Sequence, residues 1–197
     1  MNETTPTIDP QHTLLLVMDY QPAILANLPE ADALLSRMAG VIDAARRSGV
    51  QVGFIRVAFT DADYRAIPAT NKGFAVVAAS RRMSDMAPET AVHPAVAPAP
   101  GDLIVRKTRV GAFSTTDLDQ QLRARNIDTL LLAGISTSGV VLSTVRDAAD
   151  RDYRLYVLED GCADRDGDVH MVLMQKVFPR QAYVITTTKL SDLLGAQ

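Results

Sequence analysis

The segment LLLAGISTSGVVLSTVRDAADRD, residues 130–152, has the pattern of a buried strand, a tight turn and a helix. Its apolar start, through Ala133, is short and uninterrupted, which is typical of a strand covered on both faces in a parallel sheet. The turn from Gly134 to Gly139 is rich in small residues, and a helical period follows from Gly139 to Asp150. This unit predicts a strand–turn–helix element of an α/β protein.

The rest of the chain repeats the same alternation. Between the first two apolar runs, a stripe from Leu34 to Ala45 has helical spacing, and Gly49 is a plausible stop. The alternation predicts an α/β fold, a three-layer α/β/α sandwich with a doubly wound, mainly parallel six-stranded sheet. We expect strands at Thr13–Met18, Val52–Val57, Leu103–Arg106, Thr129–Ala133, Leu155–Leu158 and Tyr183–Thr186, and further helices at Gly73–Met83, Thr116–Arg125, Gly139–Asp150, Asp168–Val177 and Lys189–Leu194.

A proline-rich segment, APETAVHPAVAPAP at residues 87–100, interrupts the alternation. Its prolines are too dense for a helix or a central strand, so it is either a linker between domains or a surface connection. Because the alternation resumes directly afterwards, we expect a surface connection within a single domain that spans residues 1–197.

Composition restricts the classes of partner. The chain has 197 residues, 47% of them apolar, and a net charge of −3 without a basic block, which argues against nucleic acid. The longest apolar run, Leu14–Met18, is too short to span a membrane, and the polar N-terminus does not resemble a signal peptide. The one cysteine, Cys162, excludes an internal disulfide. We expect a cytoplasmic protein whose partner is a small-molecule substrate.

Polar residues at the carboxyl ends of the strands are the candidates for function, because ligands of parallel sheets bind there. Asp19 directly follows the first strand and is either a turn residue or a general acid/base. Lys107 ends the third strand and is either solvated or turned inward. Arg106 alternates with Lys107, and the strand period does not settle which of the two side chains points inward.

The hydroxyl side chains of the turn have two possible roles. We expect Ser136, Thr137 or Ser138 to cap the following helix. A nucleophilic role is the alternative, although no histidine lies nearby in the sequence to activate a serine. The helix N-terminus also offers N–H groups to an oxyanion or a carboxylate. Cys162 is read as a packing residue.

Metal binding has little support in the sequence. His12, His93 and His170 do not have the spacing of ligands. Asp61 and Asp63 offer carboxylates without a histidine, and we expect them to be exposed loop charges and not metal ligands. We expect no metal.

Several fragments, in order along the chain, together resemble the isochorismatase-like cysteine hydrolase superfamily. They include LLLVMDYQ, VRKTRVGAFSTTDL, LLAGISTSGVVLSTVRDAADRDY and VLEDGCADRD, and the resemblance covers roughly residues 12–190. It implies a three-layer α/β/α fold that assembles as a homodimer or higher homo-oligomer. It also implies a site built on Asp19 and Lys107, and a non-proline cis peptide at Ile135–Ser136.

The sequence departs from this superfamily at the nucleophile. Counting from Gly134, the position of the superfamily's cysteine falls on Val140, which cannot attack a carbonyl, and Cys162 follows a different strand. The aspartate and two histidines of the nicotinamidase metal motif are missing from FTDADY, residues 59–64. We therefore expect neither thioacyl chemistry, nor zinc, nor another cofactor.

The resemblance implies a cysteine-independent hydrolysis. True isochorismatases also lack the cysteine, and their aspartate is a general acid on an enol ether. Transferred here, Asp19 donates the proton, and Lys107 orients Asp19 or holds a substrate carboxylate. The binding residues implied are Gln21, Arg109, Ile135, Ser136, Gly139 and Val140.

Two alternatives remain beside this hydrolase. Val140 stands where those isochorismatases usually have glycine, which leaves the substrate open. A catalytically inactive small-molecule binder or structural member is one alternative, because a fold does not fix a function. An amidase with a displaced nucleophile, namely Ser136, Ser138 or Cys162, is the other.

Overall fold

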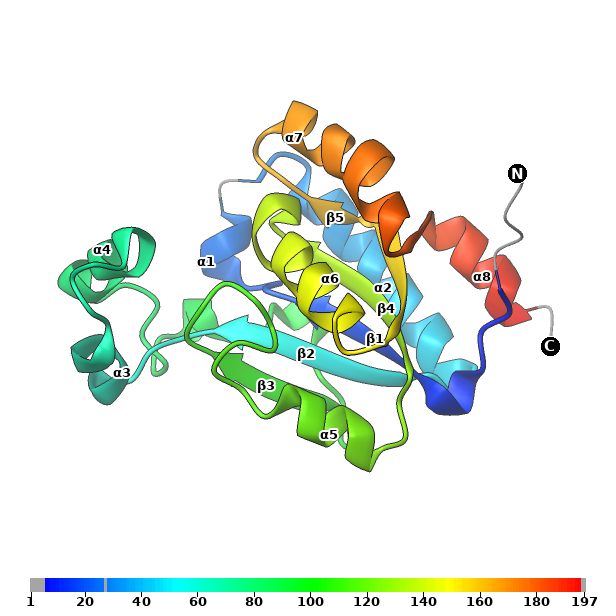
Figure 1. Cartoon of the computed structure of the whole chain (residues 1–197), viewed down its shortest axis with the longest axis horizontal. Helices are drawn as coiled ribbons and strands as arrows, with labels where there is room; N and C mark the ends of the chain where they lie inside the picture. The colour runs from blue at the N-terminus through cyan, green and yellow to red at the C-terminus, as the bar shows by residue number, and fades with distance from the viewer. Residues whose placement is uncertain (1–5, 27, 196–197) are drawn as a thin grey trace.

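The computed structural model describes residues 6–26 and 28–195, and a six-stranded sheet forms its centre (Figure 1). All the strand pairs are parallel, in the order β3-β2-β1-β4-β5-β6. The predicted α/β fold is thereby confirmed. The strands are β1 (Thr13–Met18), β2 (Gln51–Val57), β3 (Leu103–Lys107), β4 (Thr129–Ile135), β5 (Arg154–Ala163) and β6 (Tyr183–Ile185).

The strand order places β1 and β4 side by side in the middle of the sheet. The chain builds outward from β1 to β3, returns to the centre at β4 and then builds outward to β6. Because the strands are parallel, their carboxyl ends lie at one edge, and the order reverses between β1 and β4. A reversal of this kind opens a crevice for ligands in doubly wound sheets.

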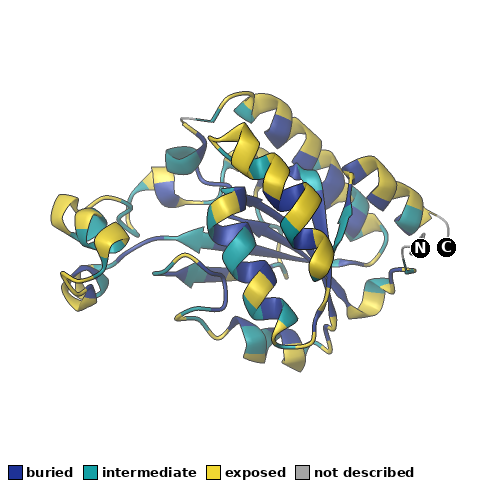
Figure 2. Ribbon diagram, turned by 45° about the horizontal axis from the view of Figure 1, so that its top comes forward, coloured by how far each residue is buried: buried dark blue, intermediate teal, exposed yellow. Residues whose placement is uncertain are grey.

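Helices cover both faces of the sheet (Figures 1 and 2). Side chains of β1 alternate between the faces: Leu15 and Val17 pack with α2 and α8, whereas Leu14 and Leu16 pack with α5 and α6. Burial on both faces explains why this strand reads as a continuous apolar run. The helices are α1 (Pro22–Leu25), α2 (Ala31–Arg47), α3 (Asp61–Ala66), α4 (Lys72–Ser80), α5 (Leu118–Ala124), α6 (Leu142–Ala149), α7 (Gly167–Val172) and α8 (Thr187–Gly195).

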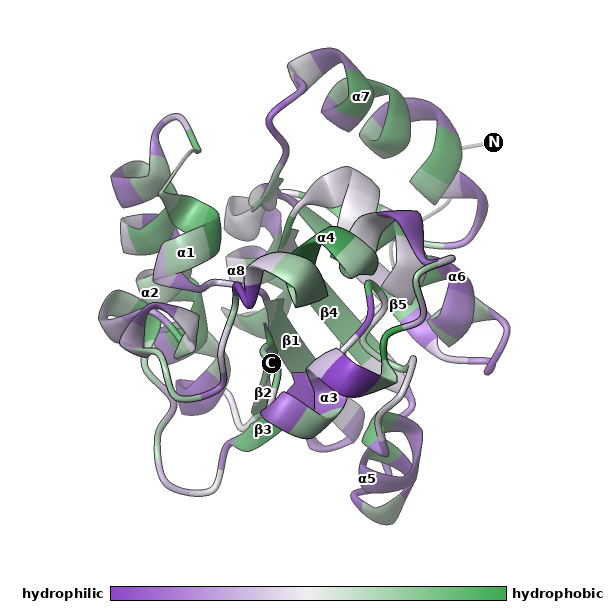
Figure 3. Ribbon diagram, turned by 90° about the vertical axis from the view of Figure 1, so that its left-hand side faces the viewer, coloured by the Kyte–Doolittle hydropathy of each residue, from purple (hydrophilic) through white to green (hydrophobic). Residues whose placement is uncertain are grey.

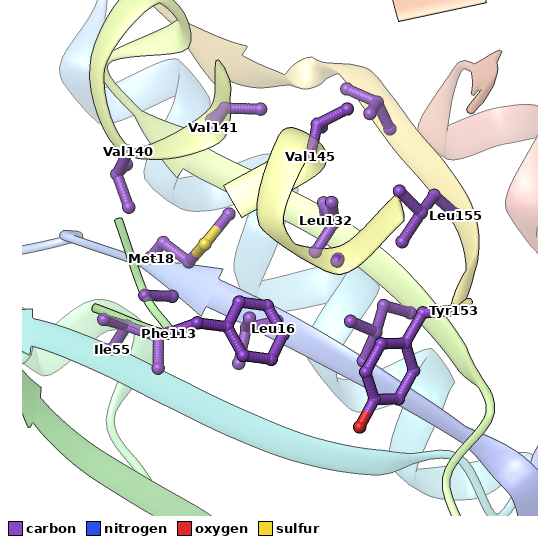
Figure 4. Packing of buried hydrophobic residues seen from close by; sticks show 14 of the residues in the cluster. Leu16, Met18, Ile55, Phe113, Leu132, Val140, Val141, Val145, Tyr153 and Leu155 are labelled. Atoms are coloured by element: carbon purple, nitrogen blue, oxygen red, sulfur yellow. The ribbon is translucent and has the colours of Figure 1, made fainter. Parts of the chain in front are cut away.

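The core on the α6 side reaches the carboxyl end of the sheet. Met18, Val140 and Val141 belong to the same buried cluster as Leu132 and Val145 (Figure 4). The turn between β4 and α6 is therefore fixed by core packing.

Several boundaries differ from the sequence-based expectations. Strand β5 extends to Ala163, so Cys162 lies within the strand and not after it, which corrects the prediction. A single π turn at Thr137–Val141 directly precedes α6, and another at Leu173–Val177 directly follows α7. The sequence did not predict α1 or α3, because four and six residues are too few for a clear helical period.

The proline-rich segment contains two short 3₁₀ helices, Pro88–Thr90 and Pro94–Val96. Thr90 and Val96 are buried, so the segment packs against the body of the protein. The interpretation of this segment as a connection within one domain remains a prediction. None of the described helices is long and apolar enough to cross a membrane.

Candidate active site

Asp19 and Lys107 meet at the carboxyl ends of β1 and β3. Lys107 Nζ lies 2.7 Å from Asp19 Oδ2, and it also donates a hydrogen bond to the Val110 carbonyl at 2.6 Å. Both side chains are buried, with relative exposures of 4% for Asp19 and 2% for Lys107. The inward-turning residue of the third strand is therefore Lys107, whereas Arg106 lies on the other face and pairs with Asp63 at 2.6 Å.

The backbone at Asp19 turns sharply as the chain leaves the sheet. Asp19 has a φ of 61°, and its N–H donates to the Ile55 carbonyl at 2.8 Å. The carbonyl of Asp19 accepts a hydrogen bond from the N–H of Gln21. Aspartate adopts this left-handed conformation more readily than larger side chains do, so the position suits a short carboxylate.

Burial dominates the electrostatics of Asp19. Desolvation raises the pKa of its carboxyl above the ordinary value of 3.8, and the charge and hydrogen bond of Lys107 offset only part of this shift. Asp19 Oδ1 is buried and has no hydrogen-bond partner among the residues that the structure describes, whereas Oδ2 is held by Lys107. One oxygen of the carboxyl is thus fixed by the protein, and the other is free.

The pair forms part of the wall of a cavity of about 440 Å³. Most of the wall is apolar, and it comes from the ends of the central strands, from α1 and from the α3–α4 segment. The lining residues are Asp19, Ala23, Ile24, Leu28, Val57, Phe59, Phe74, Val77, Arg82, Met83, Lys107, Arg109, Val110, Ile135, Ser136, Gly139, Val140, Asp164 and Arg165.

The turn after β4 forms another side of this cavity. The Ile135–Ser136 peptide bond is cis, as the resemblance implied. A Cβ atom on Gly139 would lie 2.7 Å from Ser136 Oγ, so a larger residue at this position requires the Ser136 side chain to move. Val140 lines the cavity and is 2% exposed, because it also packs in the core.

The turn is tied to the segment that follows β5. Thr137 is fully buried, and its Oγ1 lies 2.8 Å from Nδ1 of His170 on α7. The N–H of Ser138 donates to Asp164 Oδ2 at 2.7 Å. The expectation of side-chain capping is wrong, because Ser136 precedes the turn without a side-chain cap bond. Asp164 therefore occupies one of the N–H groups at the start of this helix, which were expected to be available to a ligand.

The structure separates Gln21 from the other expected binding residues. Arg109, Ile135, Ser136, Gly139 and Val140 line the cavity, but Gln21 does not. Gln21 is fully buried, and its Nε2 donates to the carbonyls of Val57 and Thr90. Its Oε1 accepts the N–H of Val57. The Gln21 amide therefore joins the end of β1 to β2 and to the proline-rich segment.

The sequence missed the contribution of the α3–α4 segment. Phe74 and Val77 of α4, with Arg82 and Met83 behind it, form part of the cavity wall. Figure 3 views the molecule from this side and shows α4 in front of the strand ends. The signal in the sequence was the apolar composition of α4, KGFAVVAAS; the structure adds that none of its residues is buried, as expected for a helix that faces a cavity.

Neither the aspartates of FTDADY nor Cys162 takes part in this cavity. Asp61 pairs with Arg81, and Asp63 caps α3 and pairs with Arg106. Within the described ranges, no group of three or more His, Cys, Asp or Glu side chains is arranged to hold a metal ion. Cys162 is buried in β5, and burial raises the pKa of its thiol to about 12.

Comparisons with known proteins agree with this architecture. The isochorismatase domain model matches residues 13–189. An uncharacterized isochorismatase family protein, YwoC of Bacillus subtilis, is 31% identical over 95% of this chain and 97% of its own length. The phenazine biosynthesis protein PhzD of Pseudomonas fluorescens is 33% identical over 93% of this chain and 86% of its own.

A solved structure of a cysteine hydrolase from Pseudomonas syringae has the same fold, with a TM-score of 0.90. The alignment covers 100% of this chain and 99% of that protein, and the two sequences are 24% identical. The family model spans all six strands of the sheet and the residues around the cavity. The chain belongs to the isochorismatase family.

Proposed function

We propose that this protein hydrolyses a small organic molecule through acid–base chemistry of Asp19 and Lys107, without a cysteine nucleophile. Relatives in the family include a probable isochorismatase of Pseudomonas chlororaphis and a ureidoacrylate amidohydrolase of Methylobacterium radiotolerans. The names of both relatives describe hydrolases. The cavity described above is of a size that suits a small substrate.

Asp19 Oδ1 is the observation that carries this proposal. A buried carboxyl oxygen normally has a hydrogen-bond partner, and exceptions call for an explanation. Here the free oxygen belongs to a residue that lines the cavity, and its carboxyl has a raised pKa. A carboxyl with these properties retains its proton to higher pH than a solvated aspartate and can give that proton to a substrate.

An enol ether is the substrate type that such a carboxyl can cleave without a nucleophilic side chain. Asp19 transfers its proton to the vinyl carbon that does not carry the ether oxygen, and the ether oxygen stabilises the oxocarbenium ion that forms at the neighbouring carbon. Water adds to that oxygen-bearing carbon, and its released proton returns to Asp19. The resulting hemiketal collapses to a carbonyl compound and an alcohol, so one water is consumed and the carboxyl is regenerated.

Lys107 has two functions in this scheme. It fixes Oδ2 of Asp19, which leaves Oδ1 as the proton-donating oxygen. Its positive charge also stabilises the carboxylate that forms after proton transfer, at the moment when the substrate is cationic. The second hydrogen bond of Lys107, to the Val110 carbonyl, restricts the position of the ammonium group.

Cys162 is poorly placed to replace a catalytic cysteine in this cavity. We assign the superfamily's cysteine position to Val140, which lines the cavity beside Gly139. Cys162 does not line this cavity but a different one, together with Glu159 and His170. Its high pKa keeps the thiol protonated at neutral pH, whereas nucleophilic cysteines need the thiolate.

A substrate screen with the Asp19→Asn variant tests the proposal. Small enol ethers and small amides are incubated with the wild-type protein, and products are followed by mass spectrometry. We expect turnover of an enol ether, lowered by about 10²–10⁴-fold in Asp19→Asn, the range for loss of a general acid. Undiminished turnover in the variant contradicts the role of Asp19. Binding without turnover across the panel favours a non-catalytic member of the family.

A further inference from the structure

The Asp19–Lys107 ion pair joins the ends of two strands that are not neighbours in the sheet. Asp19 directly follows β1 and Lys107 ends β3, and β2 lies between these two strands. Because neighbouring strands lie about 4.8 Å apart, the pair has to span two such spacings across the end of β2. The 2.7 Å between Lys107 Nζ and Asp19 Oδ2 therefore depends on how the ends of β1 and β3 are fixed relative to β2.

Lys107 is fixed by ordinary strand pairing, whereas Asp19 lies just beyond it. Val57 of β2 is the register partner of Lys107 of β3. The register of β1 with β2 ends one residue before Asp19, at Met18 and Ile55. Asp19 donates its N–H to the Ile55 carbonyl at 2.8 Å and then leaves the strand in a left-handed conformation, with a φ of 61°. The position of its carboxyl therefore depends on contacts beyond the strand pairing.

Gln21 supplies such a contact. Its Oε1 accepts the Val57 N–H at 2.9 Å, and its Nε2 donates to the Val57 carbonyl at 2.9 Å. The side-chain amide thus pairs with Val57 as the backbone of a further β1 residue would. The backbone N–H of Gln21 donates to the Asp19 carbonyl at 2.8 Å. One residue therefore holds both the Asp19 turn and the strand position that pairs with Lys107.

The Gln21 amide fits its place in one orientation. Nε2 also donates to the Thr90 carbonyl at 2.6 Å, so it faces two acceptors while Oε1 faces one donor. A reversed amide would set Oε1 against two carbonyl oxygens and Nε2 against the Val57 N–H. Gln21 is fully buried, and burial of an amide is unfavourable unless its hydrogen bonds are made. An apolar side chain here would leave the N–H and carbonyl of Val57 without these partners.

We infer that Gln21 is a positioning residue, whose amide fixes the Asp19 turn to the end of β2 and thereby sets the Asp19 carboxyl against Lys107. The inference rests on the proposed function, in which this pair acts on the substrate. Gln21 does not line the cavity, so its effect on a substrate passes through Asp19 and Lys107.

Titration of Asp19 tests the positioning without a substrate. Gln21→Met keeps the side-chain length but removes the amide, so the turn is freed from β2 and the carboxyl moves away from Lys107. Of the charged side chains that line the cavity with Asp19, those of Lys107, Arg82, Arg109, Asp164 and Arg165, Lys107 is the one that lowers the pKa of Asp19.

We expect the pKa of Asp19 to rise in Gln21→Met, because the carboxyl loses part of the Lys107 charge and hydrogen bond. Carbon-13 NMR of protein labelled at the aspartate carboxyls measures this pKa, and the signal that is missing in Asp19→Asn assigns it. An unchanged or lowered pKa in folded Gln21→Met overturns the inference.

Turnover of the best substrate of the screen gives the second readout. We expect kcat to fall about tenfold to 10²-fold in Gln21→Met with little change of KM, as for a misplaced reacting group. Gln21→Glu keeps the acceptor for the Val57 N–H and, when protonated, one donor, so it should recover part of kcat. A raised KM with unchanged kcat would assign Gln21 to substrate binding and contradict positioning. If Gln21→Met does not fold, both readouts are taken on Gln21→Glu, which should differ from the wild type in the same directions.

Thr187→Val is the matched control for loss of a buried hydrogen bond. Thr187 is 7% exposed at the start of α8, and its Oγ1 donates to Asp160 Oδ2 at 2.8 Å, away from the cavity lining. This variant should lower the urea midpoint but leave the Asp19 titration and kcat as in the wild type. Equal changes of pKa and kcat in Thr187→Val and Gln21→Met would show a general loosening and contradict the inference.

The Asp19→Asn variant separates this inference from the proposed function. A raised Asp19 pKa in Gln21→Met together with undiminished turnover in Asp19→Asn supports the positioning by Gln21 and refutes the acid–base role of Asp19. Loss of turnover in Asp19→Asn, with an unchanged Asp19 pKa and kcat in Gln21→Met, has the opposite meaning.

Discussion

Asp19 has two properties that suit a proton donor, namely burial and a carboxyl oxygen without a hydrogen-bond partner in the described part of the chain. Because its pKa is raised by desolvation, we expect the rate to be highest at low pH and to fall as the pH rises through this raised pKa, above 3.8. The sign follows from the role: the acid form is the active form. The pH profile of kcat/KM for the best substrate of the screen measures this. A rate that rises with pH over the same range assigns Asp19 as a base instead.

Cys162 gives a second prediction for a single residue. With a thiol pKa of about 12 and a buried side chain, it should react with iodoacetamide at pH 8 far more slowly in the folded protein than after unfolding in urea. Mass spectrometry measures the labelled fraction, and turnover of the treated protein should be unchanged. Rapid labelling with loss of turnover would support the alternative that the protein is an amidase with Cys162 as its nucleophile.

The sequence predicted the candidate site residues at the ends of strands, and it missed those that come from the α3–α4 segment. Asp19 and Lys107 could be found because a polar side chain ends an apolar run. The inward direction of Lys107 could not, because it depends on the alignment of β3 beside β2. Phe74 and Arg82 lie in a segment whose place over the strand ends is set by tertiary packing.

Among the elements, α7 holds the turn that follows β4. We expect His170→Ala to lower the free energy of unfolding by about 1–3 kcal/mol, because the buried Thr137 hydroxyl then loses its contact with the imidazole. Urea denaturation measures the change. Met171→Ala is the matched control on the same helix, since Met171 is 43% exposed, and it should cost less. Equal losses in the two variants would show that the contact does not stabilise the turn.

Long periodic elements were predicted more closely than short or irregular ones. The predictions of β1 and of the stripe of α2 agree with the structure, because β1 is an uninterrupted apolar run and α2 has a clear helical period. Strand β5 was cut short at Leu158, since Glu159 and Asp160 interrupt its apolar run. Its register with β4 also shifts between Leu132 and Gly134, which no local sequence pattern indicates.

For the whole molecule, the centre of the sheet should determine stability. Leu132 of β4 is fully buried, so Leu132→Ala is expected to lower the free energy of unfolding by about 2–5 kcal/mol. Ile104→Ala on the edge strand β3, where Ile104 is 53% exposed, should cost about 1 kcal/mol or less. Denaturant titration measures both variants. Similar losses at the two positions would contradict a stability set by the sheet centre.

The expectation of one domain has its own test. If residues on both sides of the proline-rich segment belong to one cooperative unit, calorimetry should show a single unfolding transition whose calorimetric and van't Hoff enthalpies agree. Arg46 of α2 already joins the two sides through its contact with Asp102. Two resolved transitions would assign the segment as a linker.

The strand order also matters while the chain is being synthesised. β1, β2 and β3 can pair as soon as residues up to Lys107 have left the ribosome, and this half already contains the ion pair with Asp19. The other edge of β1 stays unpaired until β4 is synthesised, and the first residue of β4 is 116 positions beyond that of β1. Until that partner arrives, the nascent chain has an apolar, unpaired strand edge of the kind that aggregates. Pauses in translation within β4 would therefore be the most harmful, and a chaperone would be most useful there.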